Sequence, residues 1–158
     1  MLFLVEANEK YTGELAQFKK EVLLYDKNRT DQFAGCMGLR DCSTEKDWIK
    51  LCNLRKRTET CEQAGTTVPS TTYFAIRESD NRLVGVIDLR HHIDHPILGT
   101  WGGHCGYSVR PSERGKGYAN EMLRLNIQNA KRMGLSKLLV VCDETNAASE
   151  KTILANGG

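Results

Sequence analysis

The sequence predicts an α/β fold on a mixed sheet, with the element order β-α-α-β-β-β-α-β-α in a single domain spanning residues 1–158. Three observations support this prediction. Apolar residues recur every three or four positions over residues 9–25, which is typical of one helical face. From Thr71 onward, β-branched and aromatic residues gather in short runs, which indicates strands. After Gly103, a strand-like run passes through a basic loop with glycines into a second helical pattern.

The first half of the chain is predicted to form one strand and two helices. The apolar run at residues 2–6 is short enough for a strand, and Asn8 can cap the helix over residues 9–25. The inner face of this helix is expected to consist of Tyr11, Leu15, Phe18, Val22 and Tyr25. A polar loop over residues 26–42 leads to a second helix, which Ser43 can cap and whose inner residues are Trp48, Leu51 and Cys52.

The second half is predicted to form a hairpin followed by alternating strands and helices. The elements expected in order are a strand at 71–77, a turn at 79–82, a strand at 83–89, a loop at 90–102, a strand at 104–109, a loop at 111–116, a helix at 117–133, a strand at 138–142 and a helix at 147–155. The helix that ends before Gly134 is expected to bury Ala119, Met122, Leu123, Ile127 and Ala130. Because residues 138–142 are continuously apolar, we expect that strand to be buried on both faces.

Composition and charge argue against several classes of protein. With 22 basic and 20 acidic residues the net charge is +2, which is too small to predict a nucleic-acid partner. No apolar run approaches the ~20 residues that span a membrane, and the N-terminal run lacks the basic start and cleavage site of a signal peptide. The six cysteines match no zinc-binding spacing, so we expect reduced thiols, no metal site and a cytoplasmic location.

A candidate anion-binding loop lies at residues 111–116, between a predicted strand and a predicted helix. The first turn of a helix has amide groups without partners inside the helix, and together with the helix dipole they favour an anion. Gly115 and Gly117 allow the backbone to approach a ligand closely, while Arg114 and Lys116 add positive charge for phosphate oxygens. The loop is therefore predicted to hold a pyrophosphate.

Two other phosphate-binding patterns do not match this loop. A Walker A loop requires Ser or Thr after its lysine, but Lys116 is followed by Gly117. A dinucleotide-binding loop requires a third glycine three positions later, where this chain has Asn120. These mismatches argue against a nucleotide-binding protein of another type.

The pattern Arg114-x-x-Gly117-x-Ala119 resembles motif A of the GNAT superfamily of N-acetyltransferases. Residues 143–149, in which Asn146 begins the last helix, are similar to its motif B, and the whole likeness covers roughly residues 71–158. The resemblance implies a GNAT-type acyl-CoA N-acyltransferase fold. It also implies that acetyl-CoA is the cosubstrate, and that a primary amine of a small molecule or peptide takes the acetyl group by direct attack.

The resemblance further assigns cofactor-binding residues. The strand before the loop is expected to hold the pantetheine arm through the backbone of Tyr107, Ser108 and Val109. The pyrophosphate is expected at Arg114, Gly115, Lys116, Gly117, Tyr118, Ala119 and Asn120. In motif B, Asn146 and Ser149 are expected to contact the cofactor, although Asn146 is equally suited to capping the helix.

The general acid and base are not decided by the sequence. Many family members supply the acid as a tyrosine seven residues after the motif B asparagine, but that position is Ile153 in this chain. Tyr107 is then a candidate acid, with Tyr118 or water as alternatives. His104 is a candidate base because imidazole titrates near neutral pH. The alternatives to that role are a purely structural His104 or a base among Asp88, His91 and His92.

The chain ends at Gly158, directly after the last predicted helix, whereas GNAT domains normally continue into one or two further strands. We therefore expect a domain truncated at the C-terminus, with an open edge at 138–142 and low stability as an isolated monomer. A shortened chain, a naturally short form and a homodimer whose second protomer covers the edge are the alternatives. Together with Ile153, this departure favours a second hypothesis, a catalytically inert module that binds acyl-CoA.

Overall fold

The computed structural model describes residues 1–158, except for the side chain of Leu98. Its sheet has the strand order β1-β2-β3-β4, and each neighbouring pair is antiparallel. The strands are β1 (Leu2–Glu6), β2 (Ser70–Arg77), β3 (Arg82–Arg90) and β4 (Tyr107–Val109). The helices are α1 (Thr12–Tyr25), α2 (Glu45–Arg55), α3 (Thr58–Cys61), α4 (Tyr118–Arg132) and α5 (Ala147–Ala155), with short turns at Glu9–Tyr11, Glu62–Ala64, Leu98–Gly102 and Pro111–Glu113.

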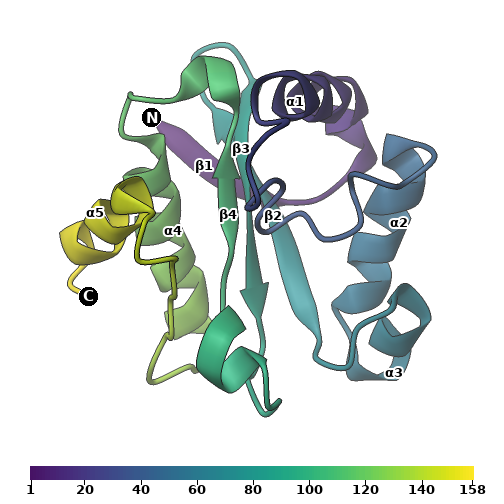
Figure 1. Ribbon diagram of the computed structural model, residues 1–158. Coiled ribbons are helices and arrows are strands. Elements are labelled where there is room, and N and C mark those ends of the chain that lie inside the picture. The colour runs from purple at the N-terminus through teal and green to yellow at the C-terminus, as the bar shows by residue number, and fades with distance from the viewer.

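Helices cover both faces of the sheet. α1 and α2 lie against one face, whereas α4 lies against the other and carries α5 on its outer side (Figure 1). On the α1 side, the stacked rings of Trp48 and Phe74 have centroids 6.3 Å apart. On the α4 side, Gly85 leaves room for Met122, whose sulfur would lie only 2.7 Å from a β-carbon at that position. The missing side chain at Gly85 thus lets α4 pack directly onto β3.

The predictions for the first half of the chain are confirmed for the strand and both helices. The helix predicted over residues 9–25 begins as a short turn that Asn8 caps, and α1 proper starts at Thr12. The prediction that Tyr25 lies on the inner face of the helix is wrong. Tyr25 is the last residue of α1 and 68% of its surface is exposed, whereas the next residue, Asp26, is buried.

The cap of α2 also differs from the prediction by one position. Thr44, and not Ser43, caps the helix, because the Thr44 hydroxyl accepts a hydrogen bond from the backbone amide of Asp47 at 3.1 Å. Trp48 and Cys52 are buried as predicted, and Leu51 is half-buried.

In the second half, the hairpin of β2 and β3, α4 and α5 are confirmed within one or two residues of the predicted bounds. Three of the five apolar residues predicted to be buried by α4 are buried, and two, Ala119 and Ile127, are half-buried. α4 also buries a polar residue that the apolar pattern did not indicate, Asn126, which has no exposed surface.

The strand predicted at 138–142 is not formed, and the sheet is consequently antiparallel and not mixed. This segment is half-buried up to Val141, and Cys142 is exposed, so the prediction of burial on both faces is also wrong. One backbone hydrogen bond links the segment to the chain before β4, from His104 N to Leu139 O at 2.8 Å. The Leu139 amide bonds instead to the His104 ring, so the ladder does not continue.

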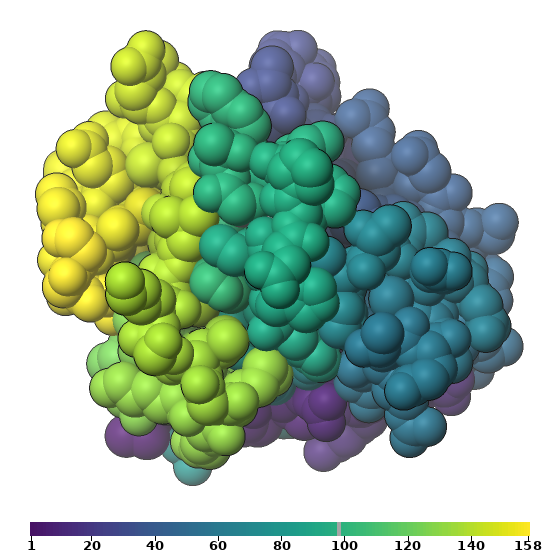
Figure 2. All heavy atoms as spheres, turned by 90° about the horizontal axis from the view of Figure 1, so that it is seen from below, coloured from purple at the N-terminus to yellow at the C-terminus, as the bar shows by residue number. Residues whose placement is uncertain are grey.

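The strand predicted at 104–109 is shorter in the structure, because only Tyr107–Val109 pairs regularly with β3. Seen from below, the segment before β4 lies between the C-terminal segment and the region of α2 and α3 (Figure 2). Hydrogen bonds tie it on both sides, from His104 N to Leu139 O at 2.8 Å and from His91 N to Pro69 O at 2.9 Å.

Among the helices that the structure describes, none combines the length and apolarity that a bilayer crossing requires.

Candidate functional site

A cleft of about 1270 Å³ opens along the free edge of β4. Its walls come from β4, the loop before α4, the first turn of α4, the segment before α5, and α5 itself. The start of the loop between α1 and α2 contributes Asp26, Arg29 and Asp31 to its wall. All the residues predicted to bind the cofactor line this cleft except Lys116.

The backbone of β4 presents polar groups to the cleft. Hydrogen bonds from Arg110 N to Val84 O and from Asp88 N to Gly106 O show which residues face β3. Because the direction alternates along an antiparallel strand, the amide and carbonyl groups of Tyr107 and Val109 point to the opposite edge, toward the cleft. An extended ligand can therefore pair with β4 as a further strand would.

The glycines of the loop before α4 adopt conformations that other residues rarely take. Gly115 and Gly117 have φ angles of +78° and +82°, and no heavy atom lies within 4 Å of the place where their β-carbons would be. α4 begins at Tyr118, so its first amides lie at the cleft with open space in front of them. This is the geometry of an anion site at a helix N-terminus.

The two cations predicted to contact phosphate are both paired with carboxylates. Arg114 forms a bidentate ion pair with Asp26, with N–O distances of 2.7 and 2.6 Å, and its Nε donates to Val109 O. Lys116 turns away from the cleft, and its Nζ donates to Glu113 at 3.0 Å. The groups left to face an anion at this candidate site are consequently backbone amides more than these two side chains.

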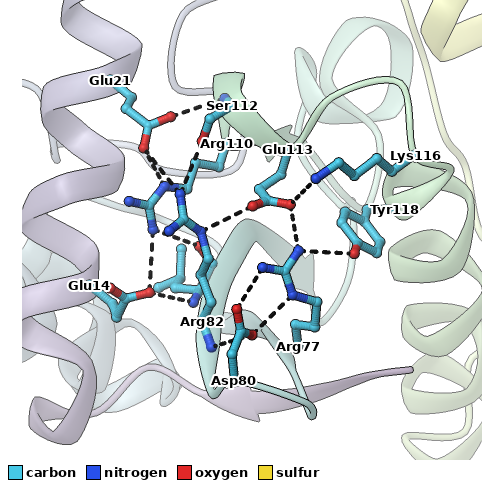
Figure 3. A network of polar contacts seen from close by, with 11 residues as sticks. Glu14, Glu21, Arg77, Asp80, Arg82, Arg110, Ser112, Glu113, Lys116 and Tyr118 are labelled. Atoms are coloured by element: carbon cyan, nitrogen blue, oxygen red, sulfur yellow. Dashed lines mark hydrogen bonds and ion pairs between the residues drawn. The ribbon is translucent and has the colours of Figure 1, made fainter.

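Glu113 joins the loop to the sheet (Figure 3). Its carboxylate is 5% exposed and accepts hydrogen bonds from Arg77 at 2.6 Å and from Lys116 at 3.0 Å. Burial alone would raise the pKa of Glu113, but these hydrogen bonds outweigh it and hold the pKa below its ordinary value. The buried Arg110 bonds in the same way to Glu21 and Glu14 of α1.

Across the cleft, β4 and α5 meet through two predicted residues. The Tyr107 hydroxyl lies 2.5 Å from Ser149 Oγ. Asn146 caps α5 by accepting a hydrogen bond from Ser149 N at 3.1 Å, so the capping role is confirmed, and Asn146 also lines the cleft. Burial raises the pKa of the Tyr107 hydroxyl, which keeps its proton available at neutral pH.

Comparisons with known proteins give the family and the fold of the chain. A sequence model of the acetyltransferase (GNAT) domain matches residues 41–158. The chain belongs to the GNAT acetyltransferase family. A search of curated protein sequences finds no match.

Three solved acetyltransferases share the GNAT fold with this chain. RimL, a ribosomal L7/L12 α-N-protein acetyltransferase in complex with coenzyme A, has a TM-score of 0.66 and 19% identity, covering 99% of this chain and 78% of RimL. The microcin C7 self-immunity acetyltransferase MccE, in complex with acetyl-CoA and AMP, has a TM-score of 0.63 and 19% identity, covering 99% and 77%. The ribosomal-protein-S5-alanine acetyltransferase from Vibrio fischeri has a TM-score of 0.54 and 15% identity, covering 99% and 77%.

His104, the predicted base, does not line the β4 cleft. His104 is 5% exposed, and its Nδ1 accepts a hydrogen bond from the Leu139 amide at 2.9 Å. Burial, with smaller contributions from Arg90 and His92, lowers the pKa of His104, which favours the neutral ring that this bond needs. In this position His104 anchors residues 138–142 beside β4.

Among the residues of the β4 cleft that the sequence did not indicate, two are charged side chains of particular interest, Lys151 and Asp26. Lys151 of α5 lines the cleft and forms no ion pair within the part of the chain that the structure describes, so it is an available cation. Asp26 was not identified because its partner Arg114 lies far away in the sequence. Among the described residues, no group of three His, Cys, Asp or Glu side chains is placed to hold a metal ion.

Proposed function

We propose that this chain is an acetyl-CoA-dependent N-acetyltransferase that transfers the acetyl group to a primary amine of a small molecule or peptide. The observation that supports it most is the continuity of the β4 cleft, which joins an open strand edge to the glycine loop at the start of α4. An acyl-CoA has the matching parts, an extended amide-containing arm and a pyrophosphate. The volume, about 1270 Å³, exceeds that of most small-molecule pockets and suits a large, flexible ligand.

The residues around the cleft fit such a ligand. The backbone groups of Tyr107 and Val109 would pair with the amides of the pantetheine arm, beside Ser108. The amides at the start of α4 would bind the pyrophosphate over the residues Gly115, Gly117, Tyr118, Ala119 and Asn120. Asn146, Ser149 and Lys151 would contact the ligand from α5 and its cap.

Two groups on β4 are placed for the chemistry. Acyl transfer develops negative charge on the carbonyl oxygen, which a backbone amide at the cleft edge of β4 can stabilise where the pantetheine arm does not use it. The Tyr107 hydroxyl lines the cleft and keeps its proton, so it is our candidate for the acid that protonates the departing thiolate. Ile153 occupies the position at which many GNAT enzymes place a tyrosine as the acid. In this chain Tyr107 on β4 would take the role of that acid.

Relatives of the same fold support coenzyme A as the ligand. RimL and MccE were solved with coenzyme A and with acetyl-CoA, respectively, and in RimL the coenzyme is joined to a cysteine by a disulfide. In this chain Cys142 is an exposed cysteine that lines the cleft. A coenzyme thiol near Cys142 would be consistent with that arrangement.

Calorimetric titration of acetyl-CoA tests the proposal. A Gly117→Asp variant places a carboxylate where the pyrophosphate is expected, and Gly134→Asp is its matched control at the other end of α4. Gly134 also has a positive φ, +88°, and open space around it. We expect the wild type and Gly134→Asp to bind, and Gly117→Asp to lose binding. Equal binding by both variants would contradict the assigned pyrophosphate site.

Release of free coenzyme A in the presence of primary amines separates the enzyme from the alternative, an inert acyl-CoA-binding module. Ile153 and the absence of a regular strand at 138–142 favour that alternative. We expect amine-dependent release by the wild type. Binding without release over a broad amine panel would instead support the inert module.

A further inference from the structure

A second hollow, of about 380 Å³, lies beside the end of β3. Most of its wall comes from residues 32–40 in the loop between α1 and α2, and β3 contributes Asp88 and Arg90. We call it the Asp88 hollow. Phe33 lines both this hollow and the β4 cleft, so the two spaces adjoin at that side chain.

Asp88 is the only carboxylate among the described residues that line the hollow. The residue is 9% exposed, and its Oδ1 accepts a hydrogen bond from Gly106 N at 2.6 Å. Gly106 itself lines the β4 cleft. The carboxylate is therefore one hydrogen bond away from the strand along which the acyl group would be held.

The position of Asp88 results from a local change in the sheet. In a regular antiparallel pair, Gly106 N would donate to the backbone carbonyl of Asp88, since Asp88 N donates to Gly106 O at 3.0 Å. Here the Asp88 carboxylate takes that amide, and the Asp88 carbonyl accepts instead from Asn126 Nδ2 of α4 at 3.0 Å. The fully buried Asn126 thus gives the Asp88 carbonyl a hydrogen-bond donor in place of Gly106 N, so the Asp88 side chain can bond to the chain before β4.

The loop between α1 and α2 packs directly on β4 at the same place. A β-carbon on Gly35 would lie 2.4 Å from Gly106 O, and Ser108 Oγ donates to Ala34 O at 2.7 Å. The hollow lies beside this contact between the loop and β4, and Asp88 is its acidic residue. Residues 32–40 of this loop form most of the wall of the hollow.

Several charged or titratable groups surround the carboxylate. Arg90 on β3 lies 3.6 Å from Oδ2. Arg40 of the α1–α2 loop is a second cation that lines the hollow, and its guanidinium donates to Gln32 Oε1 at 3.1 Å. The others that interact with the carboxylate are Arg55 and Cys52 of α2, Cys36 of the α1–α2 loop and Cys105 before β4. Burial raises the pKa of Asp88 against the opposing effect of Arg90, so this carboxylate is a stronger proton acceptor than a solvated one.

We propose that the Asp88 hollow receives the acceptor as an unhindered primary ammonium, such as a peptide N-terminus or the end of an amine chain, and that Asp88 removes its proton. This inference rests on the proposed N-acetyltransferase function. The ammonium gives one proton to the Asp88 carboxylate, and the free amine forms a C–N bond to the acetyl carbon. The C–S bond breaks, and the thiolate takes the proton of the Tyr107 hydroxyl to leave as coenzyme A. The nitrogen of the adduct loses its second proton to solvent, which returns a proton to Tyr107.

The test compares Asp88→Asn with the wild type. Asparagine keeps an oxygen that can accept from Gly106 N but cannot take a proton at neutral pH. The matched structural variant is Asn126→Ala, which disturbs the same hydrogen-bonded group without changing a base. The probes are the amino acids, spermidine and short peptides that differ in their N-terminal residue, and the measurements are acetyl-CoA affinity, kcat/KM against pH, and Tm.

We expect Asp88→Asn to lower kcat/KM by roughly 10²–10⁴-fold while acetyl-CoA affinity changes little, as for loss of a general base. In the wild type, kcat/KM should fall with decreasing pH through the Asp88 pKa, which lies above 3.8, and this limb should vanish in Asp88→Asn. The Tm of Asp88→Asn at neutral pH should equal or exceed that of the wild type, because a buried charge is removed. Asn126→Ala should lower Tm and keep the acidic limb.

The outcomes distinguish the two proposals. Absence of acetyl-CoA binding by the folded wild type, or binding without acetylation of any probe, would overturn the proposed function and this inference with it. Transfer by the wild type with kcat/KM of Asp88→Asn reduced less than about threefold would overturn the role of Asp88 alone. A lower Tm and weaker acetyl-CoA binding in Asp88→Asn, with the acidic limb retained, would make Asp88 a structural residue.

Discussion

The guanidinium of Arg114 forms a bidentate ion pair with the carboxylate of Asp26, at 2.7 and 2.6 Å. Asp26 is the C-cap residue of α1, so the pair joins the first helix to the loop before α4. The cation that the motif suggested for phosphate therefore fixes the loop through a neighbouring carboxylate. In the proposed site, anion binding is left to the backbone amides of the loop and of the first turn of α4.

The first prediction concerns Asp26. We expect Asp26→Asn to lower the free energy of unfolding by about 1–3 kcal/mol, because hydrogen bonds to charged groups contribute on that scale. Acetyl-CoA affinity should stay within about threefold of the wild type, since the lost carboxylate is no phosphate ligand. Denaturant unfolding and calorimetry measure the two quantities. A loss of affinity larger than about tenfold, in a folded variant, would show that the ion pair sets the geometry of the anion site.

The second prediction concerns the pH dependence of stability at Glu113. Its pKa in the folded protein is lowered, so the stability it contributes is present above the ordinary value of 4.5 and is lost as the pH falls through the folded pKa. We expect Glu113→Gln to lower stability at pH 7 and to flatten its decline in acid. Urea unfolding between neutral pH and pH 3 measures both effects. An unchanged slope below pH 4.5 would assign the acid sensitivity to other carboxylates, of which Glu21 is the first candidate because its pKa is also lowered.

Local patterns predicted much of this fold. The period of three or four in α1 and α4, and the β-branched runs of β2 and β3, are properties of neighbouring residues and were recovered almost at their bounds. The glycine loop was recovered for the same reason, because its φ angles demand glycine within a short stretch. The cofactor residues predicted on β4 and α5 do line one cleft.

Polar partners distant in the sequence account for what was missed. The apolar run at 138–142 indicated a strand, but the Leu139 amide is taken by the ring of His104. Asn126 lies on the buried side of α4, where its side-chain amide donates a hydrogen bond to the carbonyl of Asp88. The apolar periodicity of α4 does not indicate this interaction. Such hydrogen bonds depend on which elements come together, and the pattern of neighbouring residues within one element does not show that.

The third prediction distinguishes an anchoring His104 from a catalytic one. Asparagine can place an acceptor oxygen near the position of Nδ1, whereas leucine cannot. We expect His104→Leu to lose about 1–3 kcal/mol of stability, since the Leu139 amide is left without its partner, and His104→Asn to lose much less. Acetyl transfer at neutral pH by His104→Asn should remain close to that of the wild type. A folded His104→Asn without turnover would restore His104 as the base.

The last prediction uses Cys142 to locate the coenzyme. Four of the six cysteines are buried, Cys42 is half-buried, and Cys142 is exposed and lines the β4 cleft. A thiol reagent should therefore modify Cys142 first, as mass spectrometry of the peptides will show, and Cys142→Ser should remove that fast phase. If acetyl-CoA lies along β4 toward α5, saturating acetyl-CoA should slow modification of Cys142 and leave Cys42 unaffected. Equal slowing at both cysteines would indicate a general stabilisation of the fold, and no slowing at Cys142 would place the coenzyme outside this part of the cleft. Because the readout needs no acceptor amine, it tests the cofactor site independently of catalysis.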